Sequence, residues 1–179
     1  ENYKKQKFRL YILIGGMPQV VSRYIESNNF QVVDDEKRMI LDMYEEDLYK
    51  IDESGQLSMF FNAIPSQLQN NSSRYHVSSI ISSSRAGTSM DLMSRLKDSK
   101  TVLFSYYVND PNIDLAGTKD LRKYKMFLCD TGLFVTLAYK NKNYTENIIY
   151  EKMMNDELST NMGYIYENVV AQMLNANGI

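Results

Sequence analysis

The sequence is poor in the residues that build metal sites and histidine-based catalytic sites. Among its 179 residues there are one histidine, one cysteine and no tryptophan. A single cysteine excludes a disulfide within the chain, and one histidine with one cysteine excludes the ordinary zinc sites and argues against a histidine-based triad. Cys129 ends the apolar run Met126-Phe127-Leu128, which predicts a buried structural thiol rather than a reactive one.

Long apolar runs are also missing. No stretch approaches the roughly 20 consecutive apolar residues that a membrane-spanning helix needs. The sequence shows no signal-peptide pattern, although it opens at Glu1, so its first residues say little about targeting. Together with the lack of disulfides, these features predict a cytoplasmic location and no membrane partner.

Charge of one sign is not in excess overall, since 20 Lys and Arg residues stand against 22 Asp and Glu residues. The distribution along the chain is uneven. Residues 26–60 hold ten acids and three bases, whereas residues 72–100 hold five bases and two acids. This asymmetry indicates surfaces of opposite charge, but it neither favours nor excludes nucleic acid as a partner.

Hydrophobic periodicity predicts a mainly helical chain with one small β-hairpin. Asp34 is the expected N-cap of the third helix, and Asp130 that of the helix after the hairpin. The expected helices lie at 3–14, 18–27, 34–50, 57–64, 76–82, 88–99, 130–139 and 160–177, and the expected strands at 101–108 and 123–129.

The order of these elements is typical of a winged helix-turn-helix core flanked by N- and C-terminal helices. The helix at 88–99 takes the place of the recognition helix, and the two strands form the wing. We expect an N-terminal helical part at 1–53, a winged-helix-like core at 54–140 and C-terminal helices at 141–179, packed as one globular unit.

Two functions are compatible with this order. In the first, DNA is the partner, because phosphate contacts need cations, and the candidate contacts on or beside the core are Arg74, Arg85, Arg95 and Lys97. Asp91 and Asp98 on the same helix oppose this hypothesis. In the second, the chain binds a protein through the acidic helix 34–50 and its aromatic surface, since Tyr is enriched at interfaces and the sequence has 14 of them.

The sequence contains no complete catalytic site. The P-loop pattern of phosphate-binding enzymes is absent, and Ile14-Gly15-Gly16-Met17 lacks its lysine and hydroxyl residue. Asp35-Glu36-Lys37 resembles part of a nuclease signature, but it opens a helix, where acids favour the helix dipole. We therefore expect no catalytic residues, no metal ligands, no cofactor and no enzymatic activity in this chain.

Several short motifs together resemble a known family. They are Gly15-Gly16-Met17-Pro18, Ile64-Pro65-Ser66-Gln67-Leu68, Lys125 to Leu133 with Asp130-Thr131-Gly132-Leu133 at its end, and Gly163-Tyr164-Ile165-Tyr166-Glu167-Asn168. Their order is similar to that of the domain of unknown function (DUF4143 type) that follows the ATPase core in prokaryotic AAA+-type P-loop ATPases.

This resemblance implies a non-catalytic accessory domain that couples an ATPase core to DNA or to a protein partner. ATP and Mg²⁺ would belong only to that core, and the chain's further partners would be the core itself and a C-terminal domain. The residues of the matching motifs are expected to have structural roles, and they are Gly15, Gly16, Pro18, Asp130, Gly132, Gly163, Glu167 and Asn168.

Overall fold

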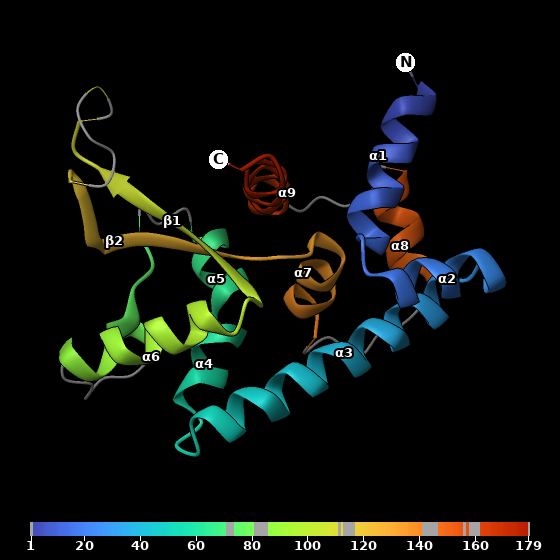
Figure 1. The fold of residues 1–179 in the computed structure, drawn as a ribbon. Helices are drawn as coiled ribbons and strands as arrows, with labels where there is room; N and C mark the ends of the chain where they lie inside the picture. Colours follow the sequence, from blue (N-terminus) through green and yellow to red (C-terminus); the bar gives the residue numbers. More distant parts are fainter. Residues whose placement is uncertain are drawn as a thin grey trace.

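The computed structural model describes residues 2–70, 74–80, 86–110, 112, 117–140, 147–155, 157 and 162–178 (Figure 1). These residues form a mainly helical structure with one two-stranded antiparallel sheet, so the predicted fold class is confirmed at this level. The division of the chain at residues 53 and 140 stays a prediction. The three parts contact one another, since α3, α7 and α9 pack together.

The helices before the sheet are α1 (Asn2–Ile14), α2 (Pro18–Ser27), α3 (Phe30–Ile51), α4 (Gln56–Asn62), α5 (Ile64–Gln69), the short 3-10 helix η1 (Val77–Ser79) and α6 (Ala86–Asp98). The sheet consists of β1 (Val102–Val108) and β2 (Lys119–Leu128), and it is followed by α7 (Thr131–Ala138), α8 (Asn147–Met154) and α9 (Gly163–Ala176). Pro18 begins α2 and Pro65 lies in the first turn of α5, where a missing N–H costs no helical hydrogen bond.

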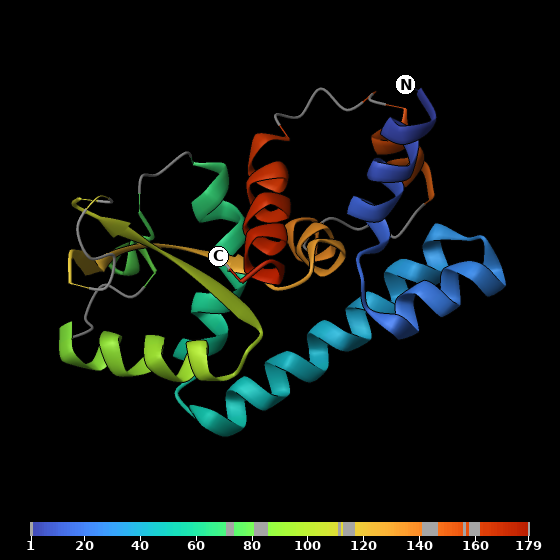
Figure 2. The ribbon, with the colours of Figure 1, turned by 45° about the horizontal axis from the view of Figure 1, so that its top comes forward.

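The helix α7 is the centre of the core. Its first seven residues are all buried, because the segment is apolar on every side. It contacts α3, α1 and α9, and both ribbon views place it between α3 and α9 (Figures 1 and 2). The outer surfaces of α3 and α9 therefore point away from each other.

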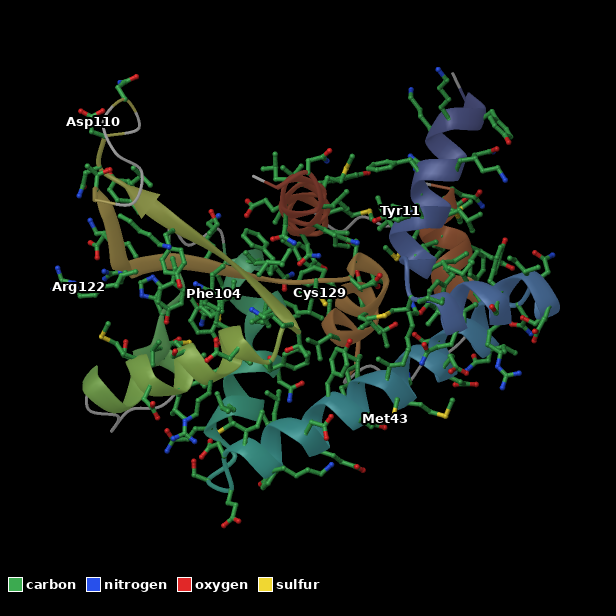
Figure 3. The ribbon with its side chains drawn as sticks, in the orientation of Figure 1. Tyr11, Met43, Phe104, Asp110, Arg122 and Cys129 are labelled. Atoms are coloured by element: carbon green, nitrogen blue, oxygen red, sulfur yellow. The ribbon has the colours of Figure 1, made fainter. Side chains whose placement is uncertain are left out.

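The sheet is a twisted hairpin whose two faces meet different helices. Phe104 and Tyr106 lie on the face that packs towards α6, as Figure 3 shows for Phe104. Leu103 and Ser105 lie on the other face, towards α9. A register shift follows Tyr106, and the extra residues of β2 at that point bend the strand (Figure 1).

Among the element boundaries that differ from the predictions, two have a clear physical reason. The third helix begins at Phe30 and its N-cap is Asn29, whose side chain accepts a hydrogen bond from the amide of Gln31. Asp34 is therefore not a cap, and it lies inside the helix as a buried residue. The second strand begins at Lys119 rather than at residue 123, because the shifted register lets the hairpin pair almost to its tip.

Candidate functional site

Three of the four cations predicted to contact DNA lie within the described residues, and their surroundings differ. Arg74 is exposed beside β2, and Arg85 lies outside the described residues. Arg95 pairs with Asp91 at 3.0 Å and donates to the carbonyl oxygen of Ile51 at 3.3 Å. Asp91, expected to oppose phosphate, thus neutralises one of the candidate contacts.

Arg95 and Lys97 also point to different sides of α6. Two residues apart on an α-helix are separated by about 200° around the axis, so their side chains do not face the same groove. Arg95 reaches the end of α3, whereas the ammonium group of Lys97 lies 5.6 Å from the ring centre of Tyr106 on β1. The two cations of the predicted recognition helix therefore contact different neighbouring elements, α3 and β1.

The hairpin cations also have partners. The ammonium group of Lys119 lies 3.7 Å from the ring centre of Tyr106, and that of Lys123 lies 5.0 Å from the ring centre of Tyr107. Arg122 pairs with Asp120 at 3.6 Å and projects from the bend of β2 (Figure 3). Such cation–ring contacts hold the lysines against the sheet while their charge stays at the surface.

A groove of about 680 Å³ lies between the sheet and α9. Most of its lining is apolar, and it combines three consecutive residues of β1 with alternate residues of β2. The lining residues are Leu103, Phe104, Ser105, Lys125, Phe127, Gly163, Tyr166, Glu167, Val170, Ala171, Leu174 and Asn175. Val170 and Leu174 are 55% and 44% exposed, so α9 presents an exposed apolar wall to this groove.

Polar contacts fix α9 beside the sheet and so shape the groove. Asn168 is fully buried, and its amide accepts from the N–H of Leu128 at 2.9 Å and donates to the carbonyl oxygen of Leu128 at 3.2 Å. Glu167 pairs with Lys125 at 2.9 Å across the groove. Gly163, another residue of the predicted structural motif, begins α9 at one end of the groove.

The strand β1, which lines one side of the groove, has an outer edge that does not pair with β2. In an antiparallel pair, residues alternate between those that bond to the partner strand and those whose backbone groups point away. The amide of Cys129 donates to the carbonyl oxygen of Thr101, so the bonded positions of β1 are 101, 103 and 105. The backbone groups of Phe104 and Tyr106 therefore point away from β2.

The two outer edges of the sheet differ in whether their outward backbone groups have hydrogen-bond partners. On β2, Leu128 bonds to the side chain of Asn168, and the carbonyl oxygen of Tyr124 accepts from the amide of Tyr75 at 2.7 Å. On β1, no described residue bonds to the outward backbone groups of Phe104 or Tyr106. Within the described part of the chain, β1 is the open edge.

A buried polar cluster lies on the far side of α7. Lys37 is 0% exposed, and its ammonium group donates to the carbonyl oxygens of Leu13 and Gly132 at 2.7 and 3.2 Å and to the hydroxyl of Tyr150 at 3.2 Å. Asp34 accepts from Arg38 at 2.7 Å, from Thr136 at 2.9 Å and from the hydroxyl of Tyr150. The cluster joins α1, α3, α7 and α8 and has no path to solvent at Lys37, so we assign it a structural role.

Burial changes the proton affinity of this cluster. Loss of water lowers the pKa of Lys37 to about 8, although Asp34 and Asp130 act in the opposite direction. The pKa of Tyr150 is raised, by burial first and then by the charge of Asp34. Burial also raises the pKa of the Cys129 thiol to about 11, so this cysteine is a neutral thiol near pH 7.

We expect stability to depend on pH through Lys37. Its pKa is about 8 in the folded chain against 10.5 for the exposed side chain, so the unfolded chain binds more protons between these values and stability rises with pH there. Relative to Lys37→Met, the free energy of unfolding of the parent should increase by about 1–2 kcal/mol between pH 7.5 and 9.5.

Urea unfolding of the two proteins at several pH values measures this. Subtracting the variant cancels the opposite effect of Cys129, which ionises at lower pH in the unfolded chain than in the folded one. A difference that stays constant or falls over this pH range would contradict the assignment for Lys37.

Two of the predicted motif regions meet at the N-terminus of α7. Asp130 is the N-cap of α7, accepting from the amide of Leu133 at 2.9 Å, and its other oxygen accepts from the amide of Gly16 at 2.6 Å. Gly15 has φ of +80°, a conformation that favours glycine. A Cβ on Gly132 would lie 2.3 Å from the carbonyl oxygen of Ile14. The turn after α1 and the start of α7 are therefore in direct backbone contact.

Sequence reasoning missed the two features that distinguish the structure, the buried Lys37 and the open edge of β1. A signal for Lys37 was present, since it lies four residues after Val33 and four before Leu41, inside the apolar stripe of α3. No comparable signal existed for the edge of β1, which depends on where α9 packs.

The described residues contain neither a candidate metal site nor a candidate membrane-spanning helix. No group of three or more His, Cys, Asp or Glu side chains among them is arranged to hold a metal ion. None of the helices in the described part of the chain is long and apolar enough to cross a membrane.

Comparison with known proteins gives a family but no characterised relative. A family model described as a domain of unknown function, DUF8612, matches residues 5–144. No curated protein matches the chain, and no solved structure does.

This match corrects the resemblance drawn from the motifs. The family is not the DUF4143 type, and no finding links the chain to an AAA+ ATPase. The motifs that suggested it consist of glycine turns, helix caps and a buried asparagine, which the geometry of many helical proteins requires. The chain belongs to the family of the domain of unknown function DUF8612.

Proposed function

We propose that this chain is a protein-interaction module, with the groove between β1 and α9 as its binding site. The observation that carries the proposal is the groove itself, which lies between an exposed apolar wall of α9 and β1, a strand whose outward backbone groups at Phe104 and Tyr106 have no hydrogen-bond partner among the described residues. An exposed apolar surface beside a strand edge that can still pair offers a polypeptide both apolar contacts and backbone hydrogen bonds.

In this proposal the winged-helix-like part is a scaffold. The order α4, α5, η1, α6, β1 and β2 supports this part of the proposal, because helices followed by a hairpin are typical of a winged helix-turn-helix. The contacts of Arg95 and Lys97 with neighbours on different sides of α6 favour a packing role for this helix over insertion into a DNA groove. The proposed function is thus the protein-binding alternative of the two that the sequence left open.

A peptide selection tests the proposal because it samples partners of any sequence. Peptides of about 12 residues are selected from a random display library on the intact chain, and the binders are then measured against two variants. Val170→Asp places a charge on the apolar wall of the groove. Ile25→Asp is the matched control, because Ile25 is also an exposed aliphatic residue, 74% accessible, but lies on α2.

We expect most selected peptides to lose about tenfold or more in affinity for Val170→Asp and to bind Ile25→Asp like the parent, because burying a charge against apolar side chains is unfavourable. Both positions are surface residues, so both variants should keep the helical circular dichroism of the parent. Binders that ignore Val170→Asp would show that the groove is not the preferred site and would overturn the proposal.

A further inference from the structure

We propose that the groove binds an extended polypeptide segment that adds to β1 as a third strand, with apolar side chains facing α9 alternating with acidic side chains facing α6. The inference rests on the proposed function and specifies the conformation and chemistry of the ligand. It follows from the backbone geometry of β1 and from the different chemistry on the two faces of the sheet.

The backbone geometry selects a strand. The outward backbone groups belong to Phe104 and Tyr106, which alternate with the positions of β1 that bond to β2. An incoming strand would pair with alternate residues of this kind. The lining of the groove includes Leu103, Phe104 and Ser105 in succession, so consecutive residues of β1 border the groove. A bound helix would leave these backbone groups unpaired.

The face towards α9 selects apolar side chains. Successive side chains of a strand point to opposite faces, so every second residue of the added strand would face α9. There it meets Val170 and Leu174, together with Leu103 on the sheet. Burial of such side chains supplies the apolar contacts that a paired backbone alone does not give.

The opposite face selects acidic side chains. Residues of the added strand that pair directly with Phe104 and Tyr106 would share the face of these two rings. On that face the ammonium groups of Lys97 and Lys119 lie 5.6 and 3.7 Å from the ring centre of Tyr106. A carboxylate beside Tyr106 would meet two cations from two elements, and neither of them has a described acidic partner.

The wall formed by α9 favours a single segment over a second folded copy. Pairing of two β1 edges would bring a second sheet together with its own α9 into a groove that α9 already borders. An isolated extended segment needs only the width of one strand, about 5 Å from its neighbour. The occupant is therefore a segment of another polypeptide with alternating apolar and acidic residues.

Backbone methylation of a model peptide tests strand pairing directly. The probe is an acetylated and amidated nine-residue peptide of alternating glutamate and valine. We propose an antiparallel register, in which residues directly opposite Phe104 and Tyr106 exchange hydrogen bonds with them. In this register the glutamate amides point to β1 and the valine amides point to solvent. N-methylation of two glutamate amides should weaken binding roughly tenfold or more, since two hydrogen bonds are lost. N-methylation of two valine amides is the matched control and should have a small effect.

Amide exchange measured by NMR on the intact chain reports the same contact from the protein side. The amides of Phe104 and Tyr106 should become protected on binding by about tenfold or more, whereas those of Leu103 and Ser105 already bond to β2. The double variant Lys97→Ala/Lys119→Ala should weaken binding of the parent peptide several-fold and reduce its dependence on salt.

The outcomes separate this inference from the proposed function. If peptides bind with sensitivity to Val170→Asp but the two methylated peptides behave alike, or Phe104 and Tyr106 gain no protection, strand addition is wrong and the interaction module stands. If no peptide is sensitive to Val170→Asp, the proposed function fails as well. Concentration-dependent dimerisation that protects Phe104 without peptide would assign the edge to a second copy and overturn the inference.

Discussion

Asp34→Ala is expected to lower the free energy of unfolding by about 3–5 kcal/mol, the range for removing one partner of a buried charged pair. The carboxylate of Asp34 accepts hydrogen bonds from Arg38, Thr136 and Tyr150, and it holds the charge of Lys37 in the core. Without it, the pKa of Lys37 should fall further, because the charge of Asp34 is the largest of the effects that raise it.

Urea or guanidinium unfolding followed by circular dichroism measures this effect. Asp35→Ala is the matched control, because Asp35 is the neighbouring acid on the same helix and is exposed. Its replacement should change the free energy of unfolding by no more than about 0.5 kcal/mol. A loss below about 1 kcal/mol for Asp34→Ala would mean that the cluster does not hold the helices together.

Gly132→Ala is expected to be the second most disruptive change, with a loss of about 3 kcal/mol or more. The added Cβ would lie 2.3 Å from the carbonyl oxygen of Ile14 and 2.6 Å from the amide nitrogen of Gly15. Both are backbone atoms, so α7 must move away from the turn after α1. That movement also breaks the hydrogen bond between Gly16 and Asp130.

Gly16→Ala provides the control for this change. Its Cβ would lie 3.7 Å from the carboxylate of Asp130, which is an ordinary contact, and its φ is not in the region that favours glycine. We expect a loss below about 1 kcal/mol for Gly16→Ala in the same unfolding measurement. Equal effects of the two substitutions would contradict the close packing of α7 on this turn.

Periodicity predicted the helices that have one apolar side well. Both ends of α2 agree with the predicted 18–27, and the predicted 160–177 contains α9. The predicted start of α3 was wrong, because an Asp before an apolar repeat is typical of an N-cap. Only the tertiary contacts with Thr136 and Tyr150 show that Asp34 is a buried residue inside the helix. Contacts this distant along the chain leave no local pattern.

The candidate site could be predicted only in part, because it depends on directions in space. Arg95 and Lys97 are close in sequence, and the helical period alone already places them on different sides of α6. The groove joins β1 to a helix that begins more than 50 residues later in the chain. In the sequence, the apolar residues of α9 that form its wall look like the buried side of an amphipathic helix. Only the packing shows that several of them are exposed.

The most direct test of the central claim compares two ligands on the same ¹⁵N-labelled chain by NMR. One is a display-selected peptide and the other is a duplex DNA, both at about 50 mM salt, where phosphate contacts are strong. Protein docking in the groove predicts that the peptide shifts the amide signals of β1 and α9 and that the DNA shifts none. DNA-induced shifts in α6 and the hairpin that disappear at about 200 mM salt, with no peptide-induced shifts in the groove, would contradict the claim.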